Sequence, residues 1–252
     1  MVATRGRSYV AGVNQVRSLR ETVYEHLRTL MSQGRLRPGS DLDLNTLARE
    51  IGISRTPLRD ALLRLESEGF VEIHNRKGVR IVELTLERIR HIYEILSGLE
   101  STALRGVAAL ITPDTVERMD ELNREMVRAL DAADFARFYD ANLAFHDSYL
   151  DLSDNAELVR RIRTLKQRLY DFPRLKGFVP EWERASVEEH EALVRCLKAG
   201  QVGEAADLLR DVHWSFPYQE AFIRRYYHAQ NVDAAADPRS ATWVGRGVTS
   251  GT

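Results

Sequence analysis

The chain has 252 residues, of which 44% are hydrophobic and 29% charged, and its formal net charge is −1. These values are ordinary for a folded, soluble protein, and the lone cysteine, Cys196, excludes an intramolecular disulfide and favours a reducing cytoplasm. No apolar run approaches the length of a membrane span and residues 1–12 contain no hydrophobic signal region, so we expect neither a membrane protein nor a secreted one.

The charge is divided unevenly along the chain. Residues 1–83 hold 14 Lys and Arg against 10 Asp and Glu, a balance of +4, which leaves 22 against 27, a balance of −5, for the rest. A basic front and an acidic back fit nucleic-acid binding by the front alone. Residues 1–16 are small and polar with two arginines, and we expect a flexible arm there.

The first expected element is a helix over Leu19–Met31, because apolar residues recur there on one face. The glycines and proline of residues 34–40 then predict a turn. Residues 47–65 predict two short helices around a second turn. Gly52 ends the first of these, and Ser54 is expected to cap the second with its hydroxyl.

The second short helix has two distinct sides. Leu58, Ala61, Leu62 and Leu65 recur at helical spacing and form a buried face, while Arg55, Thr56 and Arg59 fall on the other side, at the N-terminal end. A helix-turn-helix has this layout, since the start of its second helix enters the major groove. An ordinary helical hairpin with solvated arginines has the same pattern and is the alternative.

Residues 71–84 strengthen the DNA-binding interpretation. VEIH and VRIVEL predict two strands, and NRKG predicts the turn between them. The result is a two-stranded wing with basic residues at or near its tip. Residues 17–84 are therefore expected to form a winged helix-turn-helix.

The motifs G-x-L-x-P-G-S and LA-x-E-I-G-I-S-R-T-P-L-R-D-A-L-x-R-L-x-x-E-G closely resemble the winged helix-turn-helix of the GntR family. The resemblance covers about residues 19–84 and implies double-stranded DNA as partner. The positions that it implies as DNA contacts lie at the start of each helix of the motif and on the wing: Asn45, Ser54, Arg55, Thr56, Arg59, Asn75, Arg76, Lys77 and Gly78.

After residue 84 the pattern becomes entirely helical. Six amphipathic segments with short connections predict an all-helical bundle over residues 85–228, and Pro217 is expected to kink or split the last segment, which gives six or seven helices. The whole chain is thus mainly α. Residues 229–252 have no apolar period and are expected to be a disordered tail.

Histidines recur on the bundle helices. Asn142 and His146 are four residues apart and share a helix face, while His190 and His213 lie on later helices. Imidazoles that converge from rigid helices can hold a transition metal. Histidines this far apart in sequence are also compatible with separate, partly buried or surface positions.

Three motifs make the bundle similar to the FCD effector domain of the FadR subfamily: N-x-x-F-H at 142–146, E-H-x-x-L-x-x-x-L-x-x-G at 189–200 and A-x-x-L-x-x-x-H at 206–213. This resemblance implies a divalent metal, zinc or nickel foremost, held by Asn142, His146, His190 and His213. Arg163 and Tyr149 are expected to contact the effector. The resemblance also implies a homodimer.

Two positions depart from the family pattern. Asn142 stands where many members carry aspartate, so the bound site would be more cationic by one charge. Leu96 replaces an arginine that commonly helps hold a carboxylate. A small carboxylic acid remains the expected effector, and a metal-free pocket for an apolar ligand or an acyl thioester is the alternative.

A metal held by three histidines could also activate water, which would make a metal-dependent hydrolase. The sequence contains no nucleophile elbow, phosphate loop or dinucleotide-binding glycine motif, and Cys196 lies off the helix face of His190. We therefore expect no enzyme, but a homodimeric cytoplasmic transcription regulator, most simply a repressor, whose affinity for its operator changes when the effector binds.

Overall fold

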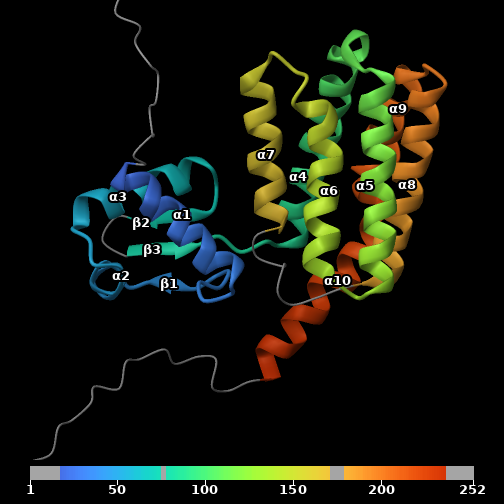
Figure 1. Cartoon of the computed structure of the whole chain (residues 1–252). Helices are drawn as coiled ribbons and strands as arrows, with labels where there is room; N and C mark the ends of the chain where they lie inside the picture. Colours follow the sequence, from blue (N-terminus) through green and yellow to red (C-terminus); the bar gives the residue numbers. More distant parts are fainter. Residues whose placement is uncertain (1–17, 75–77, 171–178, 237–252) are drawn as a thin grey trace, which may run out of the picture.

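Two hydrophobic cores organise the chain, one built from residues 23–81 and the other from residues 89–223. They belong to an N-terminal head and a C-terminal helical bundle, which are linked by residues 82–85 (Figure 1). The structure is a computed structural model that describes residues 18–74, 78–170 and 179–236, with side chains up to residue 227. The expected arm (1–16), the wing residues Asn75, Arg76 and Lys77, and residues 237–252 lie outside the described part.

The head consists of three helices and a small sheet. Its helices are α1 (Leu19–Ser32), α2 (Leu44–Ile51) and α3 (Arg55–Ser67). Gly52 ends α2 in the left-handed conformation, with φ of 71°, as a glycine allows. Ser54 occupies the N-cap position of α3, but its side chain makes no capping hydrogen bond, so the expected hydroxyl cap is absent and the exposed hydroxyl stays available.

The wing has one strand more than the two expected. Strands β2 (Val71–His74) and β3 (Gly78–Ile81) form the predicted hairpin, and β1 (Asp41–Leu42) pairs with the other edge of β3. The sheet is antiparallel throughout, in the order β1-β3-β2. A strand of two residues carries no alternating pattern of its own, because only its pairing with β3 defines it.

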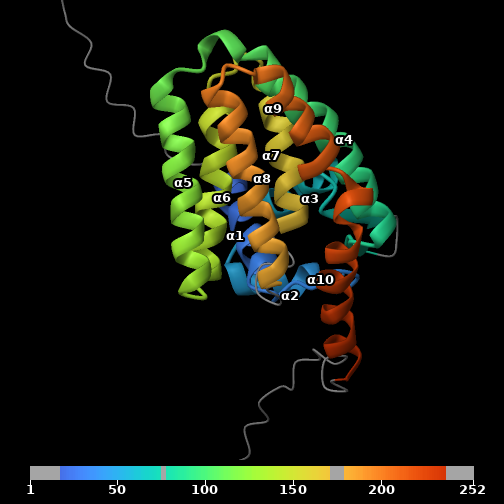
Figure 2. The same cartoon turned by 90° about the vertical axis from the view of Figure 1, so that its right-hand side faces the viewer.

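The bundle follows in an almost uninterrupted run of helices. These are α4 (Leu86–Gly106), a short 3-10 turn (Ala108–Leu110), α5 (Pro113–Asp131), α6 (Phe135–Leu150), α7 (Ala156–Tyr170), α8 (Pro180–Lys198), α9 (Val202–Leu208) and α10 (Phe216–Ala236). Helices α5 to α8 run side by side, and the end of α10 extends past them (Figure 2).

The last helical segment of the sequence is split, as Pro217 led us to expect. A π-helical turn (Leu209–His213) follows α9, and the chain then breaks before α10, in which Pro217 is the second residue. A proline is tolerated there because the N–H groups of the first turn have no partner within the helix. Helix α10 runs to Ala236 and so includes the first residues of the segment that we expected to be a disordered tail.

Candidate metal centre and DNA-contacting face

The start of α3 presents an exposed polar edge. Ser54, Arg55, Thr56 and Arg59 are all exposed, as a DNA-contacting surface requires. Nη2 of Arg55 donates to Oδ1 of Asn45 at 2.8 Å, which ties the starts of α2 and α3 together. The structure therefore places the expected contact residues of both helices side by side.

A groove on the head joins this edge to the wing. Asn45, Arg55 and Arg59 line it together with Gly78 at the start of β3. His74, at the end of β2, lines the same groove and was not among the residues expected from the sequence. Ser54 and Thr56 do not line this groove, and the wing tip lies outside the described residues.

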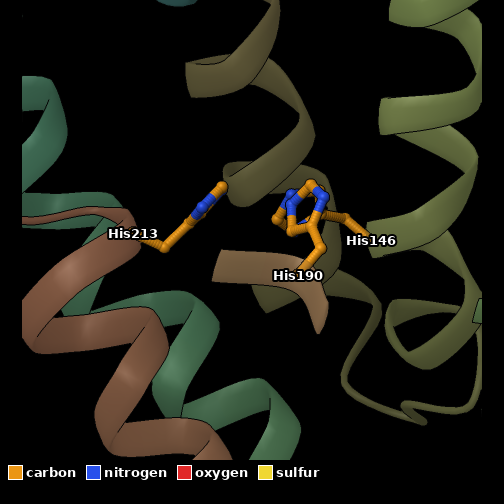
Figure 3. A group of neighbouring side chains, drawn as sticks. All are labelled: His146, His190 and His213. Carbon is orange, nitrogen blue, oxygen red and sulfur yellow. The ribbon is translucent and has the colours of Figure 1, made fainter. Parts of the chain in front are cut away.

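Three histidines meet inside the bundle. His146 on α6, His190 on α8 and His213 at the end of the π-helical turn each bring one ring nitrogen within 4.8 Å of the others. In Figure 3 the rings of His146 and His190 lie close together and the ring of His213 faces them. His146 and His190 are fully buried, and His213 is partly buried.

A buried carboxylate holds the first of these rings. Oε2 of Glu100, on α4, lies 2.9 Å from Nδ1 of His146 and accepts hydrogen bonds from the Tyr149 hydroxyl at 2.6 Å and from Nε1 of Trp214 at 2.8 Å. If Nδ1 of His146 carries the hydrogen, its Nε2 lone pair remains, and Nε2 is buried without a hydrogen-bond partner. A carboxylate behind a histidine is the usual support of a metal ligand.

The other two rings are equally available. Nδ1 of His213 lies 2.8 Å from Oε2 of Glu189, which leaves its Nε2 for a metal. Both ring nitrogens of His190 are buried without any hydrogen-bond partner among the described residues. Buried polar atoms without partners are uncommon in native proteins and call for an explanation, which a bound ion would supply.

Burial keeps the two deepest imidazoles neutral. It lowers the pKa of His146 to about 3, although Glu100 opposes the shift, and it lowers the pKa of His190 well below its ordinary value, with His213 and His146 adding to the effect. A metal binds the unprotonated nitrogen, so both rings are ready for an ion at neutral pH.

Asn142 can supply an oxygen. Its side chain is buried on α6, one helical turn before His146, and Oδ1 has no hydrogen-bond partner in the part of the chain that the structure describes. Asn142 and His213 line one cavity, of about 70 Å³, enclosed mainly by aromatic side chains. The four residues expected from the sequence thus fit a divalent ion in their donor types and in their unpaired atoms.

The two expected effector contacts lie elsewhere. Arg163 does not line this cavity, because its guanidinium bonds Asp147 and Asp151 and faces a groove between the bundle and the head. Tyr149 is fully buried and donates to Glu100, so it supports the centre without reaching the cavity. Leu96 is buried in the bundle core.

The supporting roles around the histidines were not predicted from the sequence. Glu100 and Lys166 lie on α4 and α7, far from the three histidines in sequence, so no spacing links them to the cluster. Glu189 and Trp214 stand directly beside His190 and His213, and Glu189 opens the E-H motif at 189–200, a signal that could have pointed to it.

Two family models match the chain. "Bacterial regulatory proteins, gntR family" matches residues 19–81, and "FCD domain" matches residues 91–213. A helix-turn-helix regulator from the TAR-I ttuE-ttuC' intergenic region of Agrobacterium vitis is 30% identical over 128 residues, which cover 50% of this chain and 75% of that protein. The regulator YdhC of Bacillus subtilis is 24% identical over 69% of this chain and 79% of its own.

The fold also has solved counterparts. The structure of Escherichia coli McbR/YncC matches with a TM-score of 0.65 and 24% identity, over 85% of this chain and 99% of that one. At this identity the likeness shows the fold alone.

Among the described helices, none has the length and apolar character needed to cross a membrane.

Proposed function

The chain belongs to the GntR family of bacterial regulatory proteins, with an FCD domain behind its helix-turn-helix, and from this we propose that it is a homodimeric repressor of the FadR subfamily controlled by a metal-anchored organic effector. The coarser part of this statement is shown: the chain is a DNA-binding transcription regulator and not an enzyme, because its families and relatives are regulators. The hydrolase alternative therefore finds no support.

The proposed metal site is supported by one observation, a set of buried donor atoms without hydrogen-bond partners on the helices of the bundle. Among the described residues, Nε2 of His146, both ring nitrogens of His190 and Oδ1 of Asn142 have no hydrogen-bond partner. A ring nitrogen of His213 lies near those of the other two histidines. His146, His190, His213 and Asn142 would hold the ion. When bound, the ion would act as a Lewis acid that attracts an anionic group of the effector.

The four ligands would all be neutral, so a divalent ion would keep its full charge. This favours an effector with a carboxylate or another anionic oxygen. The cavity beside His213 has room for about five water molecules, at the volume that one water needs. An acyl thioester is much larger than that, so the small acid is the better supported effector.

The head would read one half of a near-palindromic operator, and a second copy would read the other half. Arg55 and Arg59 would approach base edges from α3, while Ser54 and Gly78 would contact phosphates. An effector can shift this DNA binding only if it binds one arrangement of the two heads better than the other.

The test has three parts. Elemental analysis of the purified protein should find about one divalent ion per chain, and light scattering should give the mass of a dimer. Selection from random duplexes should yield a near-palindromic site, bound with a steep salt dependence. A protein that binds no divalent ion even after its addition would overturn the metal anchor, and a protein that selects no duplex would overturn the regulator.

A further inference from the structure

The cavity beside the metal centre has a chemical character of its own. Nine of its 16 described lining residues are Phe, Tyr or Trp, among them Tyr93, Tyr139, Tyr170 and Trp182. No lysine or arginine stands among these described lining residues. The described wall of the cavity is therefore mainly aromatic and contains no cationic side chain for an anionic ligand group.

One carboxyl group in this cavity has no partner among the described residues. Glu183, on α8, makes no hydrogen bond or ion pair within the described part of the chain, whereas Glu189 of the same helix bonds His213 and Gln219. Burial raises the pKa of Glu183 to about 8. A carboxyl group kept in such surroundings without a partner calls for an explanation beyond packing.

Glu183 lies on the same side of α8 as His190, at a distance from the candidate metal centre. It precedes His190 by seven residues, which is two helical turns and about 10 Å along the axis. Glu183 and Asn142 line the same cavity, so one ligand can reach toward the metal with one end and toward Glu183 with the other.

We propose that the carboxylate of Glu183 binds an ammonium group of the effector. The effector would then carry an anionic oxygen at one end and the ammonium group at the other. An ammonium group supplies the hydrogen-bond donors and the positive charge that the carboxylate needs, and aromatic faces attract cations. The ligand class is a small amino acid whose two charges are separated by several bonds. This inference rests on the proposed function, because the anionic end requires the metal.

The experiment uses matched ligand pairs on the metal-loaded, full-length protein. Unbranched ω-amino carboxylates of four to eight carbons are titrated by calorimetry beside the alkanoates of the same length. At least one amino member should bind about tenfold or more tightly than its alkanoate, as a charge-assisted hydrogen bond predicts. Glu183→Gln should abolish this preference and leave alkanoate binding and metal content unchanged.

The control variant is Glu188→Gln, which removes a carboxylate from an exposed position of the same helix and should behave as wild type. Proton release gives a second readout. Because Glu183 must ionise to pair with an ammonium group, binding of the amino member at pH 7 should release about one proton, measured from the enthalpies in buffers of different ionisation heat. Glu183→Gln should release none.

The failures of the two proposals differ. Equal binding of amino carboxylates and alkanoates, equal behaviour of wild type and Glu183→Gln, or no binding by any amino member would overturn the amine site and leave the metal-anchored regulator standing. Absence of metal would overturn the anchor instead. The amine site is then tested with alkylamines against the matching alkanols, among which only the amines should bind, and only with Glu183 present.

Discussion

The ammonium group of Lys166 lies 2.9 Å from Oε1 of Glu100, and both side chains are buried. The pair connects α7 to α4, and the other oxygen of Glu100 lies 2.9 Å from Nδ1 of His146. Burial alone would raise the pKa of Glu100, but His146, Lys166 and the hydrogen bonds hold it well below its ordinary value. A buried ion pair therefore supports the candidate metal centre.

Replacing Glu100 by Gln should be costly in two ways. The uncompensated charge of Lys166 should destabilise the fold by about 3–5 kcal/mol, the range found when one partner of a buried pair is removed. Loss of the carboxylate behind His146 should weaken metal binding by about 10- to 100-fold. Urea unfolding and competition with a metal-binding dye measure the two effects.

The control is Glu94→Gln on the same helix, which removes an exposed partner of Arg90 and should cost less than about 1 kcal/mol. A Glu100→Gln variant as stable and as tight for metal as Glu94→Gln would contradict the supporting role of the carboxylate.

The histidines themselves give a direct test of the centre. His146→Ala and His190→Ala should each reduce the bound metal strongly and remove the rise in melting temperature that metal gives, since only the native state has the assembled site. His26→Ala, at an exposed position in the head, is the matched control and should keep both. Full metal occupancy in both bundle variants would place the ion elsewhere.

The depressed pKa of His190 predicts a pH dependence of the metal-free protein. Above its ordinary pKa of 6.5, His190 is neutral in both the folded and the unfolded states, so its contribution is fully present. As the pH falls below 6.5, the unfolded chain binds a proton that the folded chain excludes, and stability is lost. The free energy of unfolding, measured in urea, should therefore decrease from pH 7 to pH 4.

His190→Gln should flatten part of this decrease, because glutamine cannot take up the proton. His26→Gln removes an exposed histidine and should leave the slope as in wild type. Equal slopes in all three proteins would mean that His190 is protonated as readily in the folded state as in the unfolded one.

The helices were predicted well because the residues of each helix contain a local signal for it, such as apolar spacing or a glycine at its end. The apolar spacing of residues 19–31 defined α1, and Gly52 marked the end of α2 through a conformation that glycine adopts easily. The third strand was missed because β1 consists of two residues and exists only through its pairing with β3. Local patterns cannot reveal such a partner.

The residues of the candidate site were likewise predicted only in part. His146, His190 and His213 were found from motifs that resemble those of a family, and the structure brings their ring nitrogens together. Glu183 was not predicted, because the feature that drew attention to it, the lack of a partner among the described residues, cannot be read from spacing. Arg163 was expected to contact the effector, but Asp147 and Asp151 hold its guanidinium at another surface.

Replacing an arginine should weaken DNA binding by an amount that depends on the position of that arginine and not on the lost charge alone. Arg55→Ala and Arg59→Ala should each weaken binding to the selected duplex by about 1–3 kcal/mol if they read base edges. Arg128→Ala removes the same charge from an exposed position on α5 and should change the affinity little. Gel-shift titrations at one salt concentration compare them. Equal losses in all three variants would point to a general effect of charge.

The last prediction concerns the contact between head and bundle. Gly69 follows α3, and a Cβ added there would lie 2.9 Å from Cζ of Arg168 on α7, the bundle helix nearest to the head in Figure 1. Within the described residues, Nε of Arg168 is buried without a hydrogen-bond partner, so packing holds this side chain in place. Gly69→Ala should therefore displace Arg168 and loosen the head.

Gly34→Ala separates this effect from backbone strain. Both glycines have positive φ, 81° and 67°, but a Cβ at Gly34 would meet nothing within 4 Å. Each substitution should cost about 1–2 kcal/mol of stability, the usual penalty of the left-handed conformation. Of these two substitutions, only Gly69→Ala should broaden the distribution of distances between spin labels placed at Arg20→Cys and Glu117→Cys. The labels are introduced in a Cys196→Ala background, and labelled chains are diluted by unlabelled ones.

Arg168→Ala should broaden the same distribution. Adding Gly69→Ala to it should change nothing further, because the displaced group is already gone. An unchanged distance in Arg168→Ala would show that the head is held by other contacts, of which the ion pair between Arg88 and Glu72 is the first to test.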